Sequence, residues 1–178
     1  MRGWFVTAAS VAALTCAGSA IAQPVLGAAN RPTQTPTDAA SYVDEAYAAD
    51  AFEVTSSKLA LSRSRNPAVR DLAERMIDSG TMTTNALLAA ADEANVPPPS
   101  SPSGDNVKGA MMDALTQTSG RDFDDTYIAQ QRRLQQESLA LHQRYAADGD
   151  NAILRDYAVD TAARVADQLD EVNALPSH

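Results

Sequence analysis

Residues able to carry out catalytic chemistry are few in this chain. It has 178 residues, with one cysteine, Cys16, and two histidines, His142 and His178. A hydrolytic triad needs a nucleophile beside a base, yet Ser56 and Ser57 have no histidine at plausible reach. His142 stands alone in a helical segment, where a histidine is more often packed than catalytic, and His178 is terminal. We therefore predict no catalytic residues and no enzymatic activity.

Four polar side chains stand out because each lies on or beside the apolar stripe of a helical segment. They are Glu53, Ser79, Gln135 and Gln168. One polar group on each of four helices, all facing one core, is the layout of a ferritin-like metal site.

The donor types in this set do not suit iron. A di-iron site of that class uses several glutamates and a Glu-x-x-His step on two helices, and no Glu-x-x-His occurs here. Glu53 is the single anionic member, with Asp78 nearby in the sequence, and hard iron favours several carboxylates with imidazole. We predict a hydrogen-bonded polar layer with no metal and no cofactor. The alternative is a weak or degenerate metal site built on Glu53 and Asp78.

The elements that must position these residues are helices, because apolar residues recur at three-four spacing and strand-like alternation is absent. We expect long helices over about 38–64, 66–96, 119–148 and 150–176. Asn66 before Pro67 is a typical helix start, Ser119 resembles the first residue of a capping box, and Asp150 is expected to cap the last helix.

The loop lengths predict how these helices are connected. The connection over 97–120 is long and contains a proline turn and one short amphipathic piece, 106–118, whereas the other two loops are short. Short loops join antiparallel neighbours, and one long crossover is typical of ferritin-like bundles. We predict an all-α, ferritin-like four-helix bundle over 38–176, with a crossover containing a short helix and with helices two and three parallel. The alternative is an up-and-down bundle.

The first 22 residues have the pattern of a secretory signal peptide. A positive start at Arg2 and an apolar run are followed by Ala20-Ile21-Ala22, the small-x-small pattern of a cleavage site. We predict a cut after Ala22 and a disordered tether over 23–37, rich in proline and threonine. An uncleaved anchor is disfavoured by the short apolar run, and a lipid on Cys16 by its poor sequence context.

The charge of the chain restricts its partners. The whole chain carries a net charge of −9, and loss of Arg2 with the signal makes the mature chain more acidic. Such a surface repels phosphate backbones and anionic lipids. We expect no nucleic-acid partner and no stable membrane insertion, and we leave the oligomeric state open.

The sequence resembles a bacterial family, the domain of unknown function 4142, over about 40–175. The matches include an acidic residue within Phe52-Glu53-Val54, the stretch Arg75-Met76-x-Asp78, and the Gly120-x-x-Phe123-Asp124-x-x-Tyr127 entry to the third helix. The resemblance implies an exported ferritin-like protein of the kind often labelled as outer-membrane proteins.

The departures from the family pattern bear on function. The resemblance implies three histidines: one directly after the aspartate of the second helix, one in the third and one in the fourth. This chain has Ser79, Gln135 and Gln168 there. We therefore expect a non-enzymatic periplasmic or outer-membrane-associated protein, a binding or envelope-stress module with an unknown envelope protein as partner. The alternative is a metal-binding ferritin-like protein with a redox-protective role.

Overall fold

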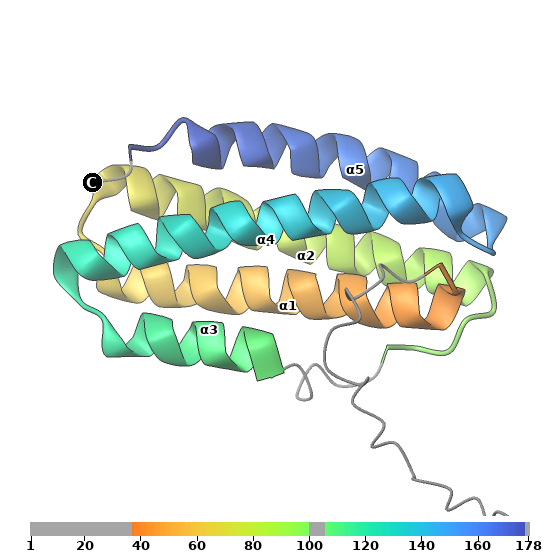
Figure 1. The fold of residues 1–178 in the computed structure, drawn as a ribbon, viewed down its shortest axis with the longest axis horizontal. Coiled ribbons are helices and arrows are strands. Elements are labelled where there is room, and N and C mark those ends of the chain that lie inside the picture. The colour runs from red at the N-terminus through yellow and green to blue at the C-terminus, as the bar shows by residue number, and fades with distance from the viewer. Residues whose placement is uncertain (1–36, 100–105, 177–178) are drawn as a thin grey trace, which may run out of the picture. The chain divides into compact units, whose positions relative to one another are not determined.

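Five α-helices account for most of the chain that the computed structural model describes, residues 37–99 and 106–176. They are α1 (Ala39–Arg63), α2 (Pro67–Glu93), α3 (Asn106–Gln117), α4 (Gly120–Asp148) and α5 (Ala152–Asn173) (Figure 1). No strand occurs in these ranges, so the all-α prediction is confirmed. Several predictions lie outside the described residues: the signal peptide over 1–22, the tether over 23–37 except its last residue, the fate of Cys16, and the terminal His178.

Side-chain caps fix where the helices begin. The carboxylate of Asp38 accepts a hydrogen bond from the Ser41 amide at 2.9 Å, and the side chain of Asn66 accepts one from the Ala68 amide at 3.0 Å. Pro67 then occupies the first turn of α2, where its missing N–H costs nothing. These starts agree with the expected helix over 38–64 and with the start expected at Asn66.

Two predicted caps differ from the structure. Asn151, rather than Asp150, caps α5 by accepting from the Leu154 amide at 3.2 Å, because the Asp150 carboxylate is engaged by the Tyr145 hydroxyl at 3.0 Å. Ser119 occupies the N-cap position of α4, but its side chain makes no capping hydrogen bond. A capping box needs Glu or Gln three residues on, and this chain has Asp122, whose side chain is shorter.

The four long helices form two pairs, α1 with α2 and α4 with α5, and the pairs meet through α1 against α4 and α2 against α5. A first apolar cluster joins the end of α1, the start of α2, the start of α4 and the end of α5. A second cluster joins the opposite ends of the same four helices. Because α2 and α4 both begin at the first cluster and end at the second, they run in the same direction (Figure 1).

The short helix α3 lies beside α1 and α4, within the connection that the sequence predicts to be long (Figure 1). Its Leu115 is buried in the first apolar cluster. Met111 and Met112 pack on a third, smaller cluster of Phe52, Leu134 and Ala49, midway along α1 and α4. The short amphipathic piece predicted over 106–118 therefore corresponds to α3, and these three residues form its inward face.

We also compared each helix with the needs of a membrane span. Within 37–99 and 106–176, none is both long enough and apolar enough to cross a bilayer.

Candidate functional site

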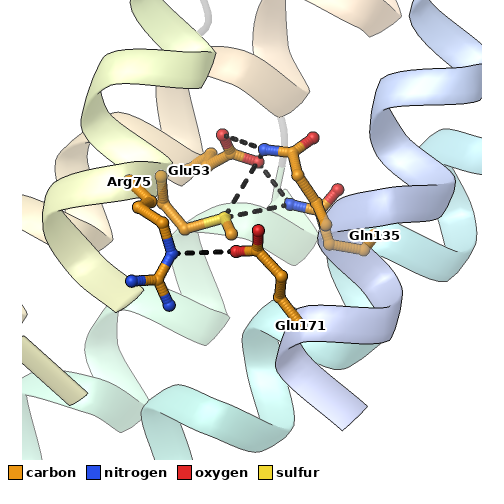
Figure 2. A network of polar contacts seen from close by, with 6 residues as sticks. Glu53, Arg75, Gln135 and Glu171 are labelled. Atoms are coloured by element: carbon orange, nitrogen blue, oxygen red, sulfur yellow. Dashed lines mark hydrogen bonds and ion pairs between the residues drawn. The ribbon is translucent and has the colours of Figure 1, made fainter. Parts of the chain in front are cut away.

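A buried polar layer lies between the two apolar clusters, centred on Glu53 of α1 (Figure 2). The Gln135 amide of α4 donates to one Glu53 carboxylate oxygen at 2.5 Å, and the Gln168 amide of α5 approaches the other at 3.5 Å. Both amide nitrogens also contact the Met76 sulfur of α2, at 3.5 and 3.6 Å. Each of the four long helices thus contributes one side chain to this layer.

Among the described residues, no basic side chain is paired with the Glu53 carboxylate. Arg75, close by on α2, forms its ion pair with Glu171 at the surface, with 2.9 Å between nitrogen and oxygen (Figure 2). Burial raises the pKa of Glu53 to about 8, the nearby Asp50 charge adds to this rise, and the two amides oppose it. Since burial penalises the charged form, this carboxyl holds its proton at neutral pH.

Asp50 is the second carboxyl near the layer, one turn before Glu53 on α1. It is half-buried, and its carboxylate accepts a hydrogen bond from the Thr84 hydroxyl of α2 at 3.2 Å. Burial raises its pKa to about 7. The charge of one carboxylate disfavours ionisation of the other, as neighbouring like charges do, and the Asp50 charge raises the pKa of Glu53.

The sequence-predicted residues of α2 lie elsewhere. Ser79 is half-buried, and among the described residues its side chain makes no hydrogen bond to Glu53, Gln135 or Gln168. Asp78 is exposed. The inward face of α2 follows the four-residue step from Met76 to Gly80, and Ser79 lies to one side of it. The structure thus brings Glu53, Gln135 and Gln168 together. Met76 lies where Ser79 was expected.

Gly80 allows α1 and α2 to approach closely at the layer. A Cβ at this position would lie 2.9 Å from a Val54 methyl and 3.0 Å from a Glu53 carboxylate oxygen. Such contacts are too short for carbon, so any larger residue would push the carboxylate or the helix aside. The sequence alone gave no reason to single out this glycine.

Further buried polar pairs extend the layer along the seam between α1 and α4. The Gln131 amide donates to the Ser56 hydroxyl at 2.9 Å, and the Tyr127 and Ser57 hydroxyls lie 2.8 Å apart. Gln131 went unnoticed in the sequence, although it lies one helical turn before Gln135. A four-residue step back from a polar core residue was the signal that could have found it.

His142 lies at the other end of this seam and is not solitary. Its Nδ1 is 2.9 Å from the hydroxyl of Tyr42, and both residues are almost fully buried. Burial lowers the pKa of His142 to about 4, so the ring is neutral. Its packed environment agrees with the interpretation that it is part of the core.

A surface cleft of about 670 Å³ opens beside the first apolar cluster. Its lining includes Arg65 and Arg121, which are exposed, and Asp124 and Asp125, each with one buried carboxylate oxygen lacking a hydrogen bond within the described chain. Arg63 also lines it but is engaged, donating to the Thr116 carbonyl at 2.9 Å. The cleft can therefore offer both charge signs to a ligand.

The chemistry available to these groups is limited. Throughout 37–99 and 106–176, no three His, Cys, Asp or Glu side chains gather as a metal site would require. At the layer itself, two amide N–H groups face the Glu53 oxygens that a metal would use. The arrangement is suited to joining four helices through hydrogen bonds.

Comparisons with known proteins give a family and a fold. The family model for a domain of unknown function, DUF4142, matches residues 23–175. A solved structure described as CopM in the Cu(II)-bound form is similar, with a TM-score of 0.61 and 13% identity. The likeness covers 76% of this chain and 93% of that chain. No curated protein matches the sequence.

Proposed function

The chain belongs to the DUF4142 family of domains of unknown function, and we propose that it is an exported, non-enzymatic binding protein of the cell envelope. One observation carries the non-enzymatic part: the polar side chains at the centre of the layer contact one another. Both oxygens of the buried Glu53 face amide nitrogens, those of Gln135 and Gln168. None of these three side chains lines the surface cleft, and a hydrogen-bonded network of this kind stabilises the packing of the four helices.

The proposed architecture is the ferritin-like one. Two antiparallel pairs, a crossover with α3, and the common direction of α2 and α4 support it. The fold likeness to the CopM structure, which is shown by a TM-score of 0.61, is in keeping with a bundle of this kind. In such bundles ligand sites are built from side chains on facing helices.

The export part of the proposal rests on the N-terminal sequence. The apolar run and the Ala20-Ile21-Ala22 pattern favour cleavage and a periplasmic location, with outer-membrane association as a variant. The acidic composition favours a protein partner over nucleic acid or anionic lipid.

The binding part has a candidate location in the surface cleft of about 670 Å³. Its volume falls in the range of about 300–1,000 Å³ of ligand sites. Because Arg65, Arg121, Asp124 and Asp125 line it, a ligand carrying both charge signs, such as a peptide segment of an envelope protein, fits its chemistry.

Metal binding is the second candidate, because the similar CopM structure contains Cu(II) and because the layer holds a thioether. Thioether sulfur suits reduced copper, and the Met76 sulfur lies against both glutamine amides beside Glu53. On this alternative the amides would swing away and Glu53 with Met76 would take the ion, giving the protein a redox-protective role.

Metal analysis of the exported protein, purified without chelator, separates the two candidates. The binding-protein proposal predicts copper, zinc and iron far below one equivalent, equally in the unmodified protein and in Glu53→Gln. One equivalent of copper in the unmodified protein that is lost in Glu53→Gln and in Met76→Leu would favour the metal candidate instead. Asp78→Asn is the matched control, since Asp78 is exposed and away from the layer.

A further inference from the structure

Four rings meet at the second apolar cluster, where α1 begins and α4 ends: those of Tyr42, Tyr145, Tyr157 and His142. The Tyr42 hydroxyl lies 2.9 Å from His142 Nδ1, and the two side chains are 0% and 1% exposed. Among the described residues the Tyr42 hydroxyl has no other hydrogen-bond acceptor. We therefore assign the Tyr42 hydroxyl as the donor to Nδ1, with the neutral imidazole carrying its own hydrogen on the other nitrogen.

The Tyr42 ring is also connected to the surface. It stacks on the Tyr145 ring, with centroids 3.8 Å apart and planes inclined by 11°. The Tyr145 hydroxyl donates to the carboxylate of the exposed Asp150 at 3.0 Å. Each of the two stacked phenols thus has its own proton acceptor, one buried and one at the surface.

A buried tyrosine with a nitrogen base on its hydroxyl is equipped for proton-coupled oxidation. Removing an electron makes a phenol a far stronger acid, so even a weakly basic imidazole takes up its proton. The low pKa of His142, about 4 because of burial, keeps the ring neutral and able to accept at neutral pH. Tyr127 offers a contrast within the same chain. Within the described part of the chain, its buried hydroxyl is hydrogen-bonded only to the Ser57 hydroxyl, which is not a base.

We propose that Tyr42 and His142 form a redox site that quenches one-electron oxidants such as carbonate or peroxyl radicals. One electron leaves Tyr42 and reduces the oxidant. The phenolic O–H bond breaks as an N–H bond forms at Nδ1, leaving a neutral tyrosyl radical beside an imidazolium. Tyr145, stacked on Tyr42 and bonded to Asp150, relays the oxidising equivalent from the surface. This activity is independent of any ligand bound at the surface cleft.

Flash oxidation of the full chain tests this site. A ruthenium polypyridyl complex, photo-oxidised by a laser flash with an irreversible acceptor, serves as the one-electron oxidant. The tyrosyl radical is followed by transient absorbance and electron paramagnetic resonance. Trp4→Phe and Cys16→Ser are present in every variant, because indole and thiol side chains are themselves oxidised and would compete with the tyrosines.

The expected outcome distinguishes the two buried phenols. Tyr42→Phe should abolish the long-lived radical, whereas the matched variant Tyr127→Phe should leave its yield unchanged. His142→Asn keeps an acceptor near the hydroxyl but takes up no proton, so radical formation should slow by about tenfold or more. Tyr145→Phe should slow formation while keeping the radical on Tyr42.

Contrary results are equally definite. A radical that survives Tyr42→Phe, or falls as much in Tyr127→Phe, would overturn the proposal, and so would an unchanged rate in His142→Asn. Helix content and melting are recorded for each variant. If His142→Asn does not fold, the unmodified chain decides the matter: transfer of the proton predicts slower oxidation in deuterated water, and equal rates in the two solvents would refute it.

Discussion

The carboxylate of Glu53 on α1 lies 2.5 Å from the amide nitrogen of Gln135 on α4, although 82 positions separate the two residues. Gln168 of α5 reaches the other oxygen, and Met76 of α2 closes the layer. Because the apolar clusters lie on either side, these contacts fix how the four helices align along their length. A polar layer of this kind is known to specify register at some cost in stability.

The stability of the protein should fall as pH rises through the pKa of Glu53. An ordinary glutamate has a pKa of 4.5, whereas that of folded Glu53 is about 8, so between these values the folded state holds a proton that the unfolded state has lost. Stability then decreases with rising pH. The raised pKa of Asp50 also lowers stability as the pH rises, up to about pH 7. The lowered pKa of His142 has the opposite effect on stability between about pH 4 and 6.5. The contribution of the carboxyl groups is therefore clearest above pH 6.5.

Glu53→Gln should flatten this pH dependence. It should also preserve or raise stability near about pH 9, because the unmodified protein carries a buried charge there and the amide does not. The gain should be at most a few kcal/mol. Unfolding free energies from denaturant titrations between pH 6.5 and about 9 measure it. Asp78→Asn should leave the slope unchanged, because Asp78 is exposed. A slope that is just as steep in Glu53→Gln would mean that Glu53 is already ionised at neutral pH.

Gly80→Ala should lower stability, by about 1 kcal/mol net, even though alanine is the better helix former. The added Cβ would meet Val54 at 2.9 Å and Glu53 at 3.0 Å, and overpacking of a core outweighs the gain in propensity. Gly109→Ala is the matched control, since nothing lies within 4 Å of a Cβ there, and it should be neutral or stabilising. Thermal melting of both variants tests the difference; equal shifts would show that α1 and α2 are not tightly apposed.

Much of this fold follows from the spacing of apolar residues and from the loop lengths. The helix starts at Asp38 and Asn66 were predictable because short polar caps precede apolar periods. The long connection predicted a crossover with a short helix, and α3 occupies it. Ser119 is the N-cap residue of α4 as predicted, although its side chain makes no capping hydrogen bond. Asp150 was wrongly predicted to cap α5, because local sequence does not show that its carboxylate accepts from Tyr145.

The polar layer could be predicted only in part. Glu53, Gln135 and Gln168 interrupt apolar stripes, so their inward direction was readable. Ser79 directly precedes Gly80, and the apolar stripe of α2 is too broad for its innermost position to be read from the sequence. The Tyr42–His142 contact spans 100 positions, and no local pattern encodes a pair formed by two helices packing together.

Histidines placed at Gln135 and Gln168 should create a metal site together with Glu53. The three side chains already converge, and two imidazoles with a carboxylate are a sufficient zinc set. We expect the double variant Gln135→His/Gln168→His to bind one equivalent of zinc and to melt at a higher temperature with zinc present. Adding Ser79→His should not tighten binding, whereas adding Met76→His should. Calorimetric titration measures the zinc affinity of each variant. Tighter binding after Ser79→His would show that Ser79, and not Met76, faces the layer.

Arg63 should hold α3 and the turn before α4 against the end of α1. Its guanidinium donates to the Thr116 carbonyl at 2.9 Å and lies over the Phe123 ring, 5.8 Å from the centroid. Arg63→Ala should cost about 1 kcal/mol and speed proteolysis within α3. Arg65→Ala, at an exposed neighbouring arginine, should change neither. Limited proteolysis with mass mapping distinguishes them, and equal cleavage rates would refute this role.

Export with signal cleavage predicts a mature chain with one defined N-terminus. Protein recovered from the periplasm should begin at Gln23, because Ala20-Ile21-Ala22 is the cleavage pattern and Cys16 has a poor lipid context. Intact mass spectrometry measures the start directly. A species that retains Cys16 with attached acyl chains would instead make the protein a membrane-anchored lipoprotein.

The protonation of Glu53 is the most direct test of a closed, metal-free layer. Carbon-13 labelling of glutamate side chains allows the Glu53 carboxyl to be followed by nuclear magnetic resonance, and the signal missing from Glu53→Gln assigns it. We predict a titration midpoint near 8, unchanged by one equivalent of zinc or reduced copper. A midpoint at or below the ordinary 4.5, or a Glu53 signal that shifts stoichiometrically with either metal, would contradict the account.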